Sequence, residues 1–127
     1  MEHVKYADIT VGTTLPERTY LVDADEVAAY RAVLGLDPGD ASVPPMFCVL
    51  LLREIRTLLP APPGGIHAAQ RFDFLAPIAV GDRITVSSRI ADKYVRNDRN
   101  NVVITTTFSR HDGTALVRGT ARRIWAE

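Results

Sequence analysis

Apolar and polar residues alternate along most of the second half of the chain. Two faces are separated between Ile66 and Phe74, with Ile66, Ala68, Gln70, Phe72 and Phe74 on one and His67, Ala69, Arg71 and Asp73 on the other. A period of two residues is that of a half-buried strand. The same reasoning predicts strands over 84–90 and over 102–110, joined by a polar tip at 97–100. Asp112-Gly113 predicts a tight hairpin turn into a last strand over 115–125.

The first half of the chain predicts helices and one short strand. Residues 19–22 are typical of a strand, and Asp23 with Glu26 three places later predicts a capped helix that ends near Leu34. Residues 36–45 are rich in turn formers and predict a loop. From Met46 to about Leu59 the pattern predicts a central helix, whose first two turns have so few polar residues that they should be enclosed on all sides.

Together these elements predict one α+β domain over residues 1–127. Val117, Gly119 and Ala121 share a face of the last strand, and small residues in a strand allow another backbone to come close. The helix that begins at Met46 is the element apolar enough to be that neighbour, so we expect a curved antiparallel sheet wrapped around it. The free edges of such a sheet favour assembly at least as a dimer.

Composition and charge exclude several classes of function. The 127 residues carry 15 Lys and Arg against 15 Asp and Glu, so no net field attracts a nucleic acid. Cys48 is the single cysteine, which excludes an internal disulfide and a cysteine-based zinc site. No apolar run approaches the roughly 18 residues of a membrane span, and the N-terminus lacks the pattern of a secretion signal. We therefore expect a cytoplasmic protein.

The order of elements, together with four short motifs, resembles a hot-dog domain of the MaoC-like dehydratase family. The motifs are Gly12-Thr13-Thr14-Leu15-Pro16, Pro44-Pro45-Met46-Phe47, the segment from Gln70 to Asp82 with its Pro-x-x-x-Gly-Asp ending, and Asp92-Lys93-Tyr94. The resemblance implies hydration of a 2-enoyl thioester or dehydration of a 3-hydroxyacyl thioester, carried on coenzyme A or a carrier protein. It implies neither a bound cofactor nor a metal, and it places the site at a dimer interface.

One segment departs from the family pattern. Complete members carry an Asp and a His after the short helix, in a motif like Asp-x-Asn-Pro-Leu-His, whereas this loop runs from Asp37 to Val43 as Asp-Pro-Gly-Asp-Ala-Ser-Val. The histidine is absent and the loop is shortened. The chain is thus similar to N-terminal, or first-half, MaoC-like domains, which form a homodimer or a heterodimer with a second hot-dog unit.

His67, Asp37 and Asp40 are the candidate catalytic residues. The ordinary pKa of histidine, about 6.5, suits proton transfer, and His67 opens a strand beside the Pro/Gly-rich segment. The alternative is a solvated histidine on the outer face of that strand. Asp37 or Asp40 could orient water or a histidine, and the alternative is that both belong to ordinary turns.

The candidate substrate-binding residues lie at the start of the central helix and on the strand after it. They are Pro45, Met46, Phe47, Gln70 and Phe72. An apolar helix start can equally be core, and the Gln70 amide needs a partner if its face is buried. Arg118, Arg122 and Arg123 could meet a phosphate, or could keep a sheet edge soluble.

Three functions follow from these residues. The first is a hydratase or dehydratase of acyl thioesters that uses His67, with Asp40 or Asp37. The second is a non-catalytic acyl-binding subunit, favoured by the absent loop histidine. The third is a hot-dog thioesterase that uses Glu54 on the central helix, although Glu54 is flanked by Arg53 and Arg56 and could be a surface residue.

Overall fold

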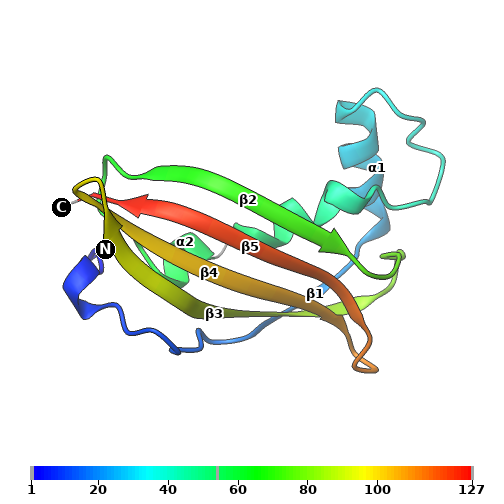
Figure 1. The fold of residues 1–127 in the computed structure, drawn as a ribbon. Coiled ribbons are helices and arrows are strands. Elements are labelled where there is room, and N and C mark those ends of the chain that lie inside the picture. Colours follow the sequence, from blue (N-terminus) through cyan, green and yellow to red (C-terminus); the bar gives the residue numbers. More distant parts are fainter. Residues whose placement is uncertain (1, 54, 127) are drawn as a thin grey trace.

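The computed structural model describes residues 2–53 and 55–126. Its strands form one antiparallel sheet in the order β1-β3-β4-β5-β2 (Figure 1). The strands are β1 (Arg18–Leu21), β2 (Ile66–Phe74), β3 (Arg83–Arg96), β4 (Arg99–Arg110) and β5 (Ala115–Trp125). The helices are α1 (Ala24–Val33), α2 (Ile55–Leu58) and two 3₁₀ helices, η1 (Tyr6–Asp8) and η2 (Pro45–Leu52). None of the described helices is long and apolar enough to cross a membrane.

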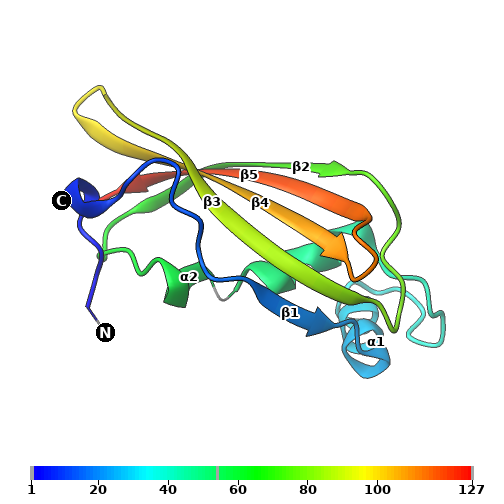
Figure 2. The same ribbon diagram turned by 90° about the horizontal axis from the view of Figure 1, so that it is seen from below.

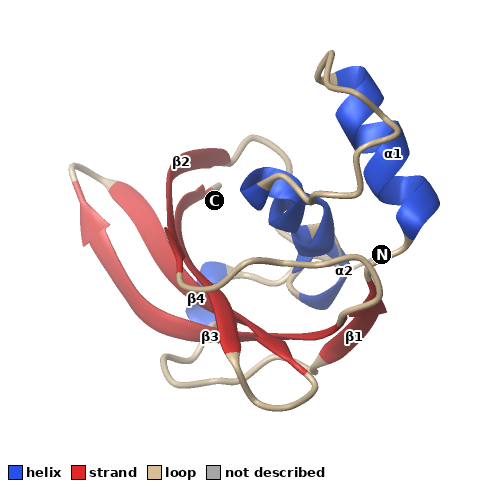
Figure 3. Cartoon of the chain, turned by 90° about the vertical axis from the view of Figure 1, so that its right-hand side faces the viewer, coloured by secondary structure: helices blue, strands red, loops and turns tan. Residues whose placement is uncertain are grey.

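The sheet curves around η2 and α2, which lie along its concave face (Figures 2 and 3). The predicted α+β architecture, with a curved antiparallel sheet around a central helical segment, is therefore confirmed. Helix α1 does not lie in the concave face of the sheet but beside one end of it, whereas β2 begins at the opposite end (Figure 1).

The predicted first helix is confirmed. The Asp23 carboxylate accepts a hydrogen bond from the Glu26 amide at 3.1 Å, as the capping pattern requires. Between β3 and β4 the turn is tighter than the predicted polar tip, because the strands pair as far as Arg96 and Arg99. The two turn residues, Asn97 and Asp98, both have positive φ, the conformation that a two-residue hairpin turn demands and that Asn and Asp tolerate.

The central helix differs from the prediction in its winding. Pro45–Leu52 is a 3₁₀ helix and only Ile55–Leu58 is α-helical. A 3₁₀ helix has three residues per turn, so residues three apart form one row. Met46 and Val49 belong to such a row and are 45% and 42% exposed, so the expectation that these turns are enclosed on all sides is wrong.

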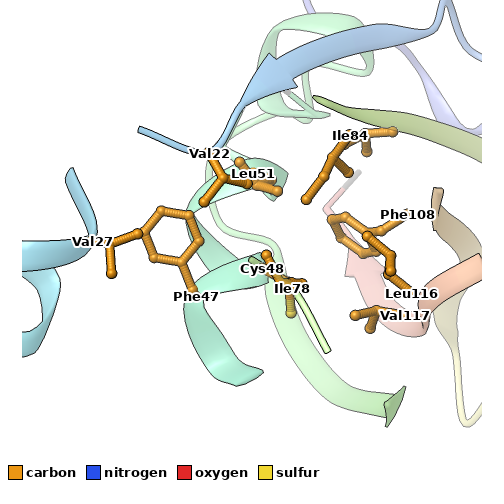
Figure 4. Packing of buried hydrophobic residues seen from close by; sticks show 11 residues of the cluster. Val22, Val27, Phe47, Cys48, Leu51, Ile78, Ile84, Phe108, Leu116 and Val117 are labelled. Atoms are coloured by element: carbon orange, nitrogen blue, oxygen red, sulfur yellow. The ribbon is translucent and has the colours of Figure 1, made fainter. Parts of the chain in front are cut away.

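The other rows of η2 enter the core. Phe47, Cys48 and Leu51 pack with inward-facing residues of β3, β4 and β5 (Figure 4). Phe47 is 1% exposed and its ring meets the Tyr30 ring edge-on, with 5.6 Å between centroids. A second cluster, which includes Ile90, Val102 and Trp125, fills the end of the sheet nearer the N-terminal segment.

The Cys48 thiol is expected to be inert in the folded protein. It has no exposed surface, and burial raises its pKa to about 11, so the reactive thiolate is scarce at neutral pH. With a disulfide-type thiol reagent at pH 7.5, we expect no fast reaction from the native chain and one thiol per chain after unfolding in urea. Fast labelling of the native protein would contradict this burial.

Candidate functional site

The loop that follows α1 is held closed by a buried arginine. Arg31 is 7% exposed, and its Nε donates to the Asp37 carbonyl at 2.8 Å. Its Nη1 donates to the carbonyl and to the hydroxyl of Ser42, each at 3.1 Å, and its Nη2 lies 3.4 Å from Asp40 Oδ2. The guanidinium thus ties both ends of the loop to the helix.

The two loop carboxylates make local turn contacts. Asp37 Oδ1 accepts from the Gly39 amide at 2.9 Å, and Asp40 Oδ1 accepts from the Ser42 amide at 2.8 Å. The hydrogen bonds from Ser42, and then the positive charge of Arg31, hold the pKa of Asp40 below its ordinary value. Asp40 is therefore ionised and engaged in shaping the loop.

The lowered pKa of Asp40 predicts a pH-dependent contribution to stability. A carboxyl whose pKa is depressed by folding stabilises the protein above its unfolded pKa, about 3.9, and loses that contribution as the pH falls through the folded value. Urea unfolding of the wild type and of Asp40→Asn should show a difference in unfolding free energy at pH 7 that shrinks below about pH 4. A difference that is constant from pH 3 to pH 7 would contradict the assignment.

A cavity of about 600 Å³ opens between the helical segment and the concave face of the sheet. We call it pocket A. The helical side supplies Met46, Val49, Leu52, Arg53 and Ile55, and the sheet supplies His67, Gln70, Phe72, Ile104, Thr106, Ala121 and Arg123. Met46, Val49 and Leu52 are spaced by three residues, so the 3₁₀ winding of η2 presents them as one apolar wall, to which Ile55 at the start of α2 adds.

His67 enters pocket A because of a β-bulge. The pairing of β2 with β5 shifts between His67 and Ala69, so Ala68 is an extra residue in the ladder. His67 is paired with Arg123 and Gln70 with Ala121, two residues that lie on the same face of β5. The predicted placement of His67 on the opposite face from Gln70 is therefore wrong.

The side chains of His67 and Gln70 are in direct contact. His67 Nε2 lies 3.1 Å from Gln70 Oε1, and Gln70 Nε2 donates to the Arg71 carbonyl at 3.2 Å. That second bond fixes the orientation of the amide, so its oxygen faces the imidazole. His67 Nε2 then carries the proton, and Nδ1 keeps the basic lone pair.

Gly119 allows Phe72 and Gln70 to lie over the sheet. A Cβ at Gly119 would be 3.3 Å from Gln70 Nε2 and 3.3 Å from Phe72 Cε1. The small residue predicted to admit the helix backbone instead admits these two side chains of β2, which is a correction to the expected packing. Thr106, which is paired with Gly119, lines pocket A, and its hydroxyl lies 2.8 Å from that of the buried Ser88.

The structure distributes the predicted substrate-binding residues and His67 among pocket A, the core and a second cavity. Met46, His67, Gln70 and Phe72 line pocket A, whereas Phe47 lies in the core. Pro45 lines a second cavity of about 320 Å³ with Phe74, at the far end of β2 from His67. At about 3.3 Å per residue the two ends of β2 are more than about 20 Å apart.

Asp37 and Asp40 belong to the α1 end as well, so one chain does not bring them to His67 (Figure 1). Glu54, the candidate thioesterase residue, lies outside the described residues. Within the described part of the chain, no group of three or more His, Cys, Asp or Glu side chains could hold a metal ion.

Among the lining residues that were not predicted as site residues, Arg53, Thr106 and Arg123 are the polar ones. From the sequence, Arg123 is interpreted only as a phosphate ligand or a solubilising residue, together with Arg118 and Arg122. Side chains alternate between the two faces of β5. Arg123 therefore lies on the inner face with Ala121, whereas Arg118 and Arg122 lie on the outer face. That alternation was the signal that could have found Arg123.

The sequence and the fold were compared with known proteins. Residues 28–118 match the model of the family described as FAS1-like, dehydratase domain region. No curated protein sequence matches the chain. Among solved structures, the unliganded R-hydratase PhaJ1 from Pseudomonas aeruginosa has 25% sequence identity and a TM-score of 0.80, over 98% of this chain and 87% of that one.

Two further structures share the fold at lower identity. The MaoC-like dehydratase from Rhodospirillum rubrum has 20% identity and a TM-score of 0.76, over 94% of each chain. The C-terminally truncated HadBC complex, a 3R-hydroxyacyl-ACP dehydratase from Mycobacterium tuberculosis, has 16% identity and a TM-score of 0.74, over 90% of this chain and 96% of that one. The resemblance to MaoC-like dehydratases and the hot-dog fold are confirmed.

Proposed function

The chain belongs to the FAS1-like dehydratase-region family, and from this premise we propose that it is a hydratase or dehydratase of acyl thioesters. It would add water across the C2=C3 bond of a 2-enoyl thioester, or remove water from a 3-hydroxyacyl thioester, carried on coenzyme A or a carrier protein. The observation that supports this most directly is the bulge that turns His67 into pocket A beside Gln70.

His67 has the features of a general base for this reaction. Gln70 Oε1 accepts the proton of Nε2 and so leaves Nδ1 to accept a proton from water. The resulting hydroxide attacks C3 of the enoyl group, and C2 then receives a proton. In the dehydration direction the same steps run in reverse. The apolar wall from η2 keeps bulk water from the acyl chain.

An assay of the purified chain against a panel of 2-enoyl-CoA thioesters tests this function. The conjugated enoyl absorbance and free thiol are followed in parallel. We expect absorbance to fall without release of thiol, and the buried Cys48 should add no background to the thiol channel. Release of thiol would contradict a hydratase and favour a thioesterase.

A second candidate function is a non-catalytic acyl-binding subunit. The observation that favours it is the loop from Asp37 to Ser42, which lacks a histidine and is tied to Arg31. The β2 strand is an open edge of the sheet, with Ile66 49% and Phe74 47% exposed, and Leu75, directly after it, is 49% exposed, so this edge offers a surface for a second hot-dog unit. HadBC, which shares the fold, is itself a complex.

Activity alone and in mixture separates the two candidates. A folded chain that shows no turnover alone, and acquires it with a hot-dog subunit that carries the Asp/His loop, would favour the binding subunit. Turnover by the chain alone would exclude it. For either function we propose a cytoplasmic location, because the single cysteine is free and buried, as is usual for proteins of a reducing compartment.

A further inference from the structure

Two buried hydroxyls interrupt the apolar inner face of the sheet. Ser88 on β3 and Thr106 on β4 are directly opposite each other in the β3–β4 ladder, and they are 4% and 5% exposed. The other buried residues between 84 and 90 and between 102 and 108 are apolar, namely Ile84, Val86, Ile90, Val102, Ile104 and Phe108. We call Ser88 and Thr106 the hydroxyl pair.

The fold does not require the hydroxyl pair. Valine has nearly the shape of threonine, and alanine nearly that of serine. Exchanging both members of a buried hydrogen-bonded pair for apolar groups of the same shape is close to neutral or stabilising. Burial of two hydroxyls costs free energy that one shared hydrogen bond returns only in part, which indicates a role for the pair beyond packing.

The hydroxyl pair has one donor more than it uses internally. Ser88 Oγ and Thr106 Oγ1 are 2.8 Å apart, and neither hydroxyl has another hydrogen-bond partner among the described residues. Each hydroxyl carries one proton and one hydrogen bond joins the two, so one proton remains. When Ser88 donates, the remaining donor is Thr106, which lines pocket A, and a hydroxyl that already accepts a hydrogen bond donates more strongly.

Thr106 lies deep in pocket A, whereas His67 is exposed at the edge strand of the sheet. On β5 the residue opposite His67 is Arg123 and the residue opposite Thr106 is Gly119. At about 3.3 Å per residue and about 4.8 Å between strands, the Cα atoms of His67 and Thr106 are about 16 Å apart. A thioester with C2 and C3 at His67 keeps its carrier in solvent, so its acyl chain runs inward toward Thr106.

We propose that Thr106 donates a hydrogen bond to a neutral oxygen on the distal part of the acyl chain, so that pocket A selects acyl thioesters with a ketone or hydroxyl several carbons beyond C3. This inference rests on the proposed function in taking the ligand to be an acyl thioester with C2 and C3 at His67. A plain alkyl chain would cover the Thr106 hydroxyl and leave its proton without a partner, which costs free energy. An oxygen at that position accepts the proton and removes the cost.

Binding of saturated thioesters tests the proposal without any turnover. Decanoyl-CoA, 5-oxodecanoyl-CoA and 9-oxodecanoyl-CoA have the same chain length, and the two ketones lie at different distances from the thioester. By isothermal titration calorimetry, we expect 9-oxodecanoyl-CoA to bind the wild-type chain about three- to tenfold more tightly than decanoyl-CoA, the range of one neutral hydrogen bond. The 5-oxo compound, whose ketone is nearer His67, should have a smaller advantage. Thr106→Val should abolish the preference and bind decanoyl-CoA at least as tightly as the wild type does.

Matched variants keep the result interpretable. Thr107→Val alters the neighbouring threonine, whose side chain lies on the outer face of β4, and the preference should persist. The double variant Ser88→Ala/Thr106→Val leaves no unpartnered hydroxyl, so it tests the proposal even if Thr106→Val does not fold. Equal affinities of decanoyl-CoA and 9-oxodecanoyl-CoA for the wild type, or a preference that survives in the double variant, would overturn the proposal.

The carbonyl oxygens of the thioester and of the pantetheine arm are the other sources of a neutral acceptor. If Thr106→Val weakens the binding of decanoyl-CoA and 9-oxodecanoyl-CoA by the same factor, Thr106 binds an oxygen that both compounds share, and the proposal is overturned. A chain that prefers 9-oxodecanoyl-CoA but hydrates no enoyl thioester would support this inference and contradict the proposed function.

Discussion

Replacing His67 with alanine is expected to lower turnover of a 2-enoyl-CoA by about 10²- to 10⁴-fold, the usual contribution of a positioned general base. The physical reason is the loss of the Nδ1 lone pair that Gln70 keeps free in pocket A. His67 is exposed and outside both core clusters, so the melting temperature should stay within about 2 °C of the wild type. Steady-state kinetics and thermal unfolding of the same preparation give both values.

The matched control for this prediction is His111→Ala. His111 is exposed in the hairpin turn between β4 and β5 and does not line pocket A, so its removal should leave turnover unchanged. Unchanged turnover in His67→Ala would exclude His67 as the base.

The strands were predictable because their alternation is a local property. Each of the long strands has one face in the core, and the Asp-Gly turn is encoded in two adjacent residues. A β-bulge leaves no such trace. The extra residue at Ala68 reverses the face of His67, and the side-chain pattern alone does not show where a ladder gains a residue. The predicted face of His67 was therefore wrong, and the proposed site depends on that face.

The winding of the central helix was unpredictable for a related reason. The segment from Met46 to Leu52 is apolar at every position, so it has no periodicity from which to read three or 3.6 residues per turn. Packing against the sheet decides the winding, and the winding decides which residues enter pocket A. Met46 was therefore grouped with Phe47 from the sequence, although the structure separates them.

In the loop after α1, the interpretation that depends only on neighbouring residues agrees with the structure. One interpretation of Asp37 and Asp40 from the sequence is that both belong to turns, and both carboxylates accept hydrogen bonds from turn amides. What the sequence did not reveal is Arg31, because a buried arginine six residues before Asp37 looks like an ordinary helix residue. Its bonds to the loop are tertiary contacts with no periodic pattern.

Phe47→Ala is expected to destabilise the fold strongly, whereas Met46→Ala, one residue earlier, should affect ligand binding. Phe47 is 1% exposed and packs against Tyr30, Val22 and Val27, so its truncation leaves a cavity that costs about 3–5 kcal/mol. The melting temperature should fall by about 10–20 °C. Scanning calorimetry and urea unfolding measure this loss.

Met46 gives the contrasting result because 45% of its surface is exposed and it lines pocket A. We expect Met46→Ala to cost less than about 1 kcal/mol of stability and to weaken binding of an apolar acyl chain about fivefold, through lost apolar contact. The pair therefore separates a core residue from a pocket residue within one turn of the same helix. Equal losses of stability in the two variants would contradict the placement of Phe47 in the core and of Met46 at pocket A.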